Sequence, residues 1–251
     1  MHYHRPRCMN TFSDSVATAL QLLLSFDPQL WVIVGRSLAV SATACALGYA
    51  LGVLAGAGLA VSRFRGRSAV LVGLNTLLAL PSVVVGLVVY LLLSRTGPLG
   101  FLGWLFSFKA MVLAQVILVL PVVTALTRQV VEDVERQHGE QWASLGAGTW
   151  LRSLILAWDE RMALMTIFVT AFGRAISEVG AVMIVGGNID GFTRVMTTAI
   201  ALETSKGDLP LALALGLVLL AVVGLLNLLV GLLRRRADGA APGNPALVGG
   251  L

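Results

Sequence analysis

The sequence predicts an all-α polytopic membrane protein. Hydrophobic residues make up 57% of the 251 residues and charged residues only 12%, whereas a soluble domain carries about 25% charged residues. The charges are also far apart, which leaves uncharged stretches as long as the roughly 20 apolar residues that a transmembrane helix needs. This shortage of charge excludes a soluble enzyme, a disordered protein and a coiled coil.

Five transmembrane helices are predicted, four of them from stretches without any charged residue. Those four stretches are residues 37–62, 68–94, 110–127 and 209–233. The remaining span, at residues 162–187, contains Arg174 and Glu178 but is apolar on both flanks. Two of the spans contain proline, which removes a backbone hydrogen bond, and we therefore expect kinks at Pro81 and Pro121.

A short helix is predicted before the first span. Residues 12–26 have a short apolar part that ends at Asp27 and Pro28, so we expect an amphipathic helix lying at the membrane interface. In the alternative reading this segment crosses the bilayer, which gives six spans and a cytoplasmic N-terminus.

Basic residues predict which side of the membrane each loop faces, because cytoplasmic loops carry an excess of arginine and lysine. Three places on one side hold ten basic residues, and they follow the first span, separate the third from the fourth, and follow the fifth. These residues are Arg63, Arg65, Arg67, Arg128, Arg136, Arg152, Arg161, Arg234, Arg235 and Arg236. With five spans, the excess predicts an outside N-terminus and a cytoplasmic C-terminus.

One transmembrane unit between two tails is expected. Residues 1–29 form an N-terminal tail with the interfacial helix, residues 30–235 the transmembrane domain, and residues 236–251 a flexible C-terminal tail. Cys8 lies in the first tail and Cys45 inside an apolar run. We expect the two cysteines to lie at different depths, and therefore no disulfide.

Three glycines in the first span predict a face of close helix packing. Gly48, Gly52 and Gly56 are spaced four residues apart, so they stack on one side of a helix. Small residues at this spacing let two backbones approach closely in lipid.

The longest polar stretch of the chain, residues 128–161, is predicted to dock on a partner. Its 34 residues hold four arginines and six acids, so its net charge of −2 reverses the positive charge expected of a cytoplasmic loop. Gly139 and the run 146–148 are expected to interrupt the helix on either side of a short helix at 140–145. An amphipathic helix follows from Thr149, and an inert amphipathic connector stays open as the alternative.

Arg174 and Glu178 mark a candidate translocation site inside a span. Four residues apart on a helix, they share a face, and with a span that starts near residue 162 Arg174 lies about 18 Å deep. A charge at that depth costs at least about 2.5–3.5 kcal/mol, which a mutual pair reduces. Two interpretations stay open, a group on the translocation pathway and a structural ion pair that holds helices together.

Three stretches of the chain resemble a known family. The run Glu140-Gln141-Trp142-Ala143-Ser144-Leu145-Gly146-Ala147 resembles the coupling motif of type I ABC-transporter permeases, with Gln141 and Trp142 in place of the two usual alanines. Residues 173–189 resemble the oxyanion branch of that family. Residues 193–208 are most similar to its tungstate-type members, and the resemblance covers nearly the whole chain.

The resemblance implies roles for particular residues. Those that couple the chain to an ATPase would be Glu140, Ala143, Ser144, Leu145, Gly146 and Ala147. Those of the translocation pathway or gate would be Arg174, Ser177 and Glu178. Small side chains in the coupling motif would let this helix sit in a cleft of the ATPase.

The resemblance also implies an activity and its partners. The chain would be the permease subunit of a binding-protein-dependent ABC importer in the cytoplasmic membrane of a bacterium or archaeon. It would move an oxyanion, with tungstate favoured and molybdate or sulfate as alternatives. Its partners would be a second copy of the chain, a cytoplasmic ATPase dimer that binds ATP-Mg, an extracytoplasmic binding protein and the lipid bilayer.

The chain shows no site for supplying the energy itself. It contains no Gly-x4-Gly-Lys-Ser/Thr phosphate-binding loop and no visible catalytic constellation. We therefore expect a transport subunit that is not an enzyme, without a cofactor or metal of its own and without a nucleic-acid partner. The competing class is a secondary transporter or channel for a small anion.

Overall fold

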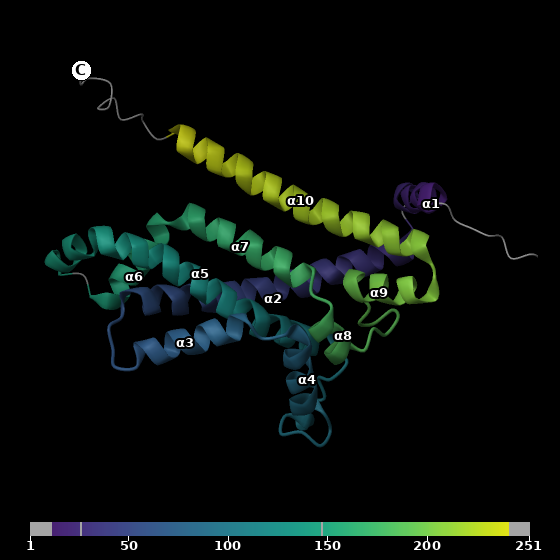
Figure 1. The fold of residues 1–251 in the computed structure, drawn as a ribbon, viewed down its shortest axis with the longest axis horizontal. Coiled ribbons are helices and arrows are strands. Elements are labelled where there is room, and N and C mark those ends of the chain that lie inside the picture. Colours follow the sequence, from purple (N-terminus) through teal and green to yellow (C-terminus); the bar gives the residue numbers. More distant parts are fainter. Residues whose placement is uncertain (1–11, 26, 147, 241–251) are drawn as a thin grey trace, which may run out of the picture.

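The computed structural model describes residues 12–25, 27–146 and 148–240, and this part of the chain is almost entirely helical (Figure 1). It forms ten α-helices and one short 3-10 helix, with no strand among the described residues. The helices are α1 (Phe12–Leu24), α2 (Pro28–Val61), α3 (Arg67–Leu78), α4 (Ser82–Leu93), η1 (Gly100–Leu102), α5 (Phe108–Ser144), α6 (Thr149–Asp159), α7 (Arg161–Ile176), α8 (Gly180–Gly186), α9 (Met196–Lys206) and α10 (Leu209–Ala240). The predicted all-α fold is confirmed.

The long helices α2 and α5 pack side by side at the centre of the molecule (Figure 1). A Cβ atom at Gly52 would lie 2.7 Å from the Cβ of Val123. One at Gly56 would lie 2.5 Å from the carbonyl oxygen of Thr124. No side chain fits in such gaps, so the face of close packing predicted from the glycine spacing is confirmed.

Three helices are long enough to span a membrane alone, and two pairs of helices, each joined at a bend, could provide two more spans. Helices α2, α5 and α10 are each long and apolar enough to cross a membrane. Helices α3 and α4 meet at an angle of 99°, and α7 and α8 meet at 56°. When each bent pair counts as one span, the described residues provide up to five spans, which is the predicted number.

The two prolines within spans have different effects. Pro81 lies at the break between α3 and α4, where the sequence predicts a kink. Helix α5 instead continues through Pro121. Neighbouring helices and local adjustments can satisfy the backbone groups that a proline frees inside a membrane helix, so a proline alone does not decide where a span breaks.

Helix α2 begins at Pro28, well before the predicted start of the first span at residue 37. One carboxylate oxygen of Asp27 accepts hydrogen bonds from the backbone N–H groups of Gln29 (2.9 Å) and Leu30 (3.0 Å), which caps the helix. Proline at the first helical position is already in helical geometry. The uncharged window therefore marks the apolar part of the span and not the whole helix.

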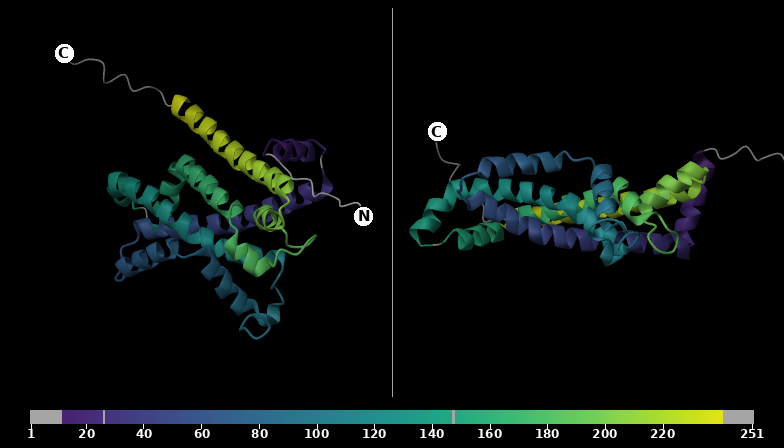
Figure 2. Two further views of the ribbon diagram at one scale, coloured as in Figure 1. Left: turned by 45° about the vertical axis from the view of Figure 1, so that its right-hand side comes forward. Right: turned by 90° about the horizontal axis from the view of Figure 1, so that it is seen from below.

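The first and last helices lie beside each other (Figures 1 and 2). Helix α1 has 13 residues, which is shorter than a membrane span, and it packs against α10. The short helix predicted at 12–26 is therefore present. Helix α10 continues to Ala240, into the predicted C-terminal tail.

Helix α4 projects from the rest of the molecule and packs mainly against the short helix α8 (Figures 1 and 2). A Cβ atom at Gly86 of α4 would lie 2.7 Å from the Cα of Ala181. One at Gly180 of α8 would lie 2.7 Å from a methyl group of Val83. This close contact anchors α8, and with it the bend between α7 and α8.

Candidate coupling and translocation sites

The predicted coupling segment forms the end of helix α5 and the turn that follows. Residues 140–144 are the last of α5, and Leu145 is 76% exposed. Gly146 has a φ of +79°, a left-handed conformation that glycine adopts without strain and that ends the helix. The side chain of Ala143 and the whole of Ala147 lie outside the described residues.

Gly139 does not interrupt α5, so the prediction of a separate short helix at 140–145 is wrong. A glycine inside a helix costs only about 1 kcal/mol, and α5 continues past it to Ser144. A Cβ atom at Gly139 would lie 2.6 Å from the carboxyl carbon of Glu135. That carboxylate forms an ion pair with Arg152 of α6 at 2.6 Å. The glycine therefore makes room for the contact that ties α6 to α5.

A second cluster of ion pairs surrounds Glu132 of α5. Its carboxylate lies 3.3 Å from a guanidinium nitrogen of Arg67, the first residue of α3. It also pairs with Arg136 at 3.1 Å and with Arg128, one helical turn to either side. Together with the contact to α6, this cluster joins three helices at the end of the molecule where the coupling segment lies.

The charged span is interrupted between α7 and α8. Helix α7 ends at Ile176 and α8 begins at Gly180. Arg174 and Ser177 are exposed and Glu178 is half-buried. Because the helix ends between them, Arg174 and Glu178 do not share a helix face as predicted, and no ion pair joins them in the described part of the chain.

Glu178 does not pair with Arg174 but stabilises the break between α7 and α8 through hydrogen bonds. Its carboxylate accepts a hydrogen bond from the backbone N–H of Ala181 (3.1 Å) near the start of α8, where a negative charge is favoured. Its carbonyl oxygen accepts a hydrogen bond from the hydroxyl of Thr197 in α9 (2.7 Å). Glu178 thus links the break to both α8 and α9.

Two further polar side chains satisfy helix ends near the break. The carboxamide of Gln115 in α5 donates to the carbonyl oxygen of Ala175 (2.8 Å), close to the end of α7. The hydroxyl of Ser37 in α2 accepts from the backbone N–H of Met196 (2.6 Å), the first residue of α9. Helix ends leave such groups without a partner in their own helix. These contacts make a broken helix tolerable inside a membrane.

A narrow polar gap, too tight to hold a water molecule, lies between α2, α5 and the break. Its polar lining comes from Ser37, Ser41, Gln115, Glu178 and Thr197. The carboxamide oxygen of Gln115 is buried there and has no hydrogen-bond partner within the described residues. Hydroxyl, carboxamide and carboxylate groups gathered in one place can exchange hydrogen bonds if the broken span moves.

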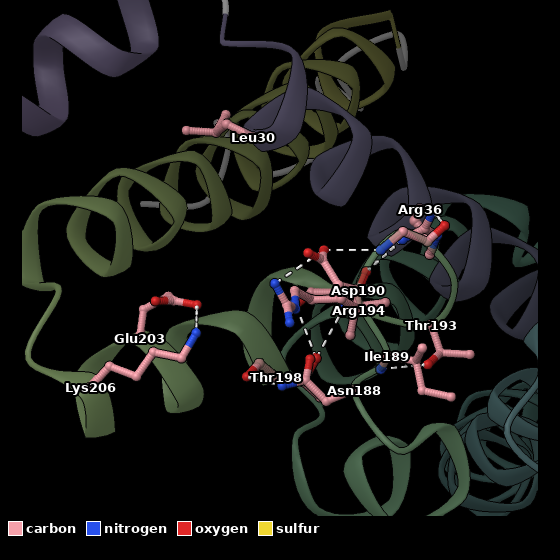
Figure 3. Close-up of polar contacts among 12 residues, drawn as sticks. Leu30, Arg36, Asn188, Ile189, Asp190, Thr193, Arg194, Thr198, Glu203 and Lys206 are labelled. Atoms are coloured by element: carbon pink, nitrogen blue, oxygen red, sulfur yellow. Dashed lines mark hydrogen bonds and ion pairs between the residues drawn. The ribbon is translucent and has the colours of Figure 1, made fainter.

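At the end of the molecule away from the coupling segment, Arg36 is hydrogen-bonded to the loop between α8 and α9 (Figure 3). Its guanidinium, which extends from α2, donates to the carbonyl oxygens of Gly191 (2.7 Å) and Arg194 (3.3 Å). Arg194 in turn pairs with Asp190 at 3.1 Å. These contacts fix the loop after α8 to α2, beside a cavity of about 710 Å³.

Sequence reasoning located the residues of the break but missed the side chains that support it, which are Ser37, Gln115 and Thr197. A carboxamide inside the uncharged stretch 110–127 was an available signal for Gln115. The two hydroxyl residues carry no such signal. The described residues contain no group of three or more histidine, cysteine and acidic side chains that could hold a metal.

Comparison with known proteins defines the class of this chain. Residues 48–239 match the family of binding-protein-dependent transport system inner membrane components. The chain belongs to this family, whose members are type I ABC-transporter permeases.

Individual relatives are similar over most of the chain. The tungstate uptake system permease protein TupB of Peptoclostridium acidaminophilum is 42% identical over 222 residues, which cover 88% of this chain and 97% of the relative. A probable anion ABC transporter permease protein of Haloferax volcanii is 42% identical over 82% of this chain and 91% of its own length. The molybdenum transport system permease protein ModB of Escherichia coli K12 is 30% identical over 72% of this chain and 83% of its own length.

Proposed function

We propose that the chain is the permease subunit of an ABC importer for tungstate. The observation that carries the proposal is the 42% identity over nearly the full length of a tungstate uptake permease. Permeases named for molybdenum and sulfate are less similar, at 30% and 31% identity. Tungstate is therefore favoured over the other oxyanions.

In this proposal the transporter contains two copies of the chain. Arg174 and Ser177 are exposed near the middle of a span, and ionisable groups at such depth face a bundle interior or a watery path. A second copy would cover this surface and enclose the pathway between the two subunits. Arg174 would then attract the anion.

The coupling segment would dock on a cytoplasmic ATPase dimer that binds ATP-Mg. The excess of arginine at this end of the molecule supports a cytoplasmic position. Because α5 is continuous, a displacement of residues 140–146 would pass directly along it. The ion pairs of Glu132 and Glu135 would carry the same displacement into α3 and α6.

At the other membrane surface an extracytoplasmic binding protein would deliver the anion. ATP binding would close the ATPase pair and open the spans outward, and hydrolysis would return them to the inward-facing state. The break between α7 and α8 is suited to such movement, because its polar contacts are hydrogen bonds that can re-form.

Reconstitution tests the proposed function. The chain, its ATPase and its binding protein are placed in proteoliposomes, and tungstate uptake is measured with ATP in excess. We expect uptake that requires ATP and the binding protein, and that excess molybdate inhibits more than excess sulfate or phosphate does. A complex with a catalytically inactive ATPase is the control.

Two results would contradict the proposal. Uptake of sulfate or molybdate without uptake of tungstate would show that the substrate is wrong. Tungstate uptake that continues without ATP or the ATPase would indicate a secondary transporter or a channel.

A further inference from the structure

A cavity of about 930 Å³ lies where α2 ends and α3 begins, and we call it the Arg63 cavity. Its lining comes from the turn between these helices and from α5 and α6. The side chains used below are Arg63, Phe64, Glu132, Glu135, Glu140 and Arg152. Its volume is at the upper end of the roughly 300–1,000 Å³ typical of sites for small ligands.

The charges of the Arg63 cavity leave one arginine free. Four arginines and three glutamates line it, so the arginines exceed the glutamates by one. Glu132 is paired with arginines of α3 and α5, and Glu135 is paired with Arg152. Arg63 is exposed and forms no ion pair with another described residue. Glu140 of the lining also forms no ion pair with another described residue. The cavity therefore offers an anion the unpaired guanidinium of Arg63 and a net charge of +1.

The Arg63 cavity lies at the depth of lipid headgroups when α2 crosses a membrane. The 26 residues between Arg36 and Arg63 are uncharged and correspond to about 39 Å of helix. A bilayer measures about 40–45 Å across its two headgroup layers. The two arginines therefore reach opposite headgroup layers, and Arg63 reaches the one expected to face the cytoplasm.

Helix α3 provides an apolar surface next to the cavity. It lies at the edge of the molecule in both Figure 1 and the right-hand view of Figure 2. Its side chains Val70, Val72 and Leu77 are exposed, and so is Phe64 in the turn before it. An acyl chain can lie along this surface while its headgroup occupies the cavity.

We propose that the Arg63 cavity binds the headgroup of an anionic phospholipid, with its phosphate on Arg63 and its acyl chains along α3. The guanidinium fork matches the geometry of a phosphate group, and basic residues near the cytoplasmic surface attract anionic lipids. The bound lipid joins the α2–α3 turn to the membrane beside the Glu132 cluster. This inference does not depend on the substrate of the transporter.

Native mass spectrometry of the assembled permease–ATPase complex tests the proposal. The probes are phosphatidylglycerol and phosphatidylcholine with identical acyl chains, together with inorganic phosphate and glycerol 3-phosphate as free anions. We expect phosphatidylglycerol to bind in preference, and R63Q to weaken its binding about fivefold, the loss expected for one basic residue near the membrane surface. R63K retains part of the binding, because it keeps the charge but loses the guanidinium fork.

R161Q is the matched control. Arg161 is exposed at the same end of the molecule and lies outside the cavity. Its guanidinium donates to the carbonyl oxygen of Trp158 and forms no ion pair with another described residue. The lipid site is supported if R63Q weakens phosphatidylglycerol binding and R161Q does not. It is overturned if the two lipids bind equally, if the two variants behave alike, or if free phosphate or glycerol 3-phosphate displaces the lipid at millimolar concentration.

Discussion

Arg174 and Glu178 have different roles in the structure, although their spacing suggests a pair. Glu178 is hydrogen-bonded within its own chain: its carboxylate accepts from the N–H of Ala181, and its carbonyl oxygen accepts from the hydroxyl of Thr197. Arg174 is exposed and has no ion-pair partner among the described residues. A charge left in this state near the middle of a span is costly unless something outside the chain faces it. The arginine is therefore the better candidate for contact with the anion.

Replacing Arg174 tests this assignment. We expect R174Q to lower tungstate uptake at least tenfold while the complex still assembles, and R174K to retain more uptake because it keeps the charge. E178Q should have a smaller effect, since an amide oxygen still accepts the hydrogen bond from Ala181. Uptake and co-purification of the ATPase are measured for each variant.

The opposite interpretation makes a different prediction for the same variants. If the two residues form an ion pair across the subunits for structural reasons only, both single variants lose assembly. The double variant then regains part of it, because neither charge is left alone. Normal uptake by R174Q would exclude Arg174 from the pathway.

At the scale of the elements, helix α5 connects the break between α7 and α8 with the predicted coupling segment. Gln115 in its first half supports the end of α7. Glu132 and Glu135 in its second half hold α3 and α6. No break separates these positions, so we expect a movement of α5 to reach both.

G139V tests the role of α5 in coupling. A side chain at this position collides with the carboxylate of Glu135 and separates it from Arg152. We expect ATP hydrolysis to continue while tungstate uptake falls about tenfold, which gives a higher ratio of ATP hydrolysed to anion carried. Hydrolysis and uptake are measured in the same proteoliposomes.

G148A is the control for this change. Gly148 has nothing within 4 Å of an added Cβ atom, and its φ is −65°, so alanine fits without strain. We expect normal coupling in G148A. An unchanged ratio in G139V as well would show that the contact between α5 and α6 does not transmit the movement.

The elements differ in how far they could be predicted from sequence. Long uncharged runs identify the spans because the cost of burying charge in lipid is large and local. The break after Ile176 has no proline or glycine at its centre. It depends on Gln115 and Thr197, which lie far away in the chain and are brought close only by the fold. Gly139 does not end α5, because a single glycine inside a helix costs only about 1 kcal/mol and the flanking turns continue the helix.

For the whole molecule, five spans and the distribution of arginine predict opposite sides for the two termini. A short α1 beside α10 is consistent with a helix that does not cross the membrane. We expect a tag at the N-terminus to be accessible from outside intact cells and a tag at the C-terminus to be accessible only after the membrane is opened. Labelling of tagged chains with an impermeant reagent measures both. Inaccessibility of both tags in intact cells would instead support six spans.

Helix α2 gives the protein a mechanical link between the two membrane surfaces. Its 34 residues form about 51 Å of uninterrupted helix, which exceeds the roughly 30 Å of hydrocarbon in a bilayer. One end grips the loop after α8 through Arg36, and the other end leads into the Arg63 cavity. A tilt of this rod therefore displaces both ends at once, in opposite directions about a point inside the bilayer. The lipid proposed at one surface and the loop after α8 at the other surface are therefore coupled through a single helix.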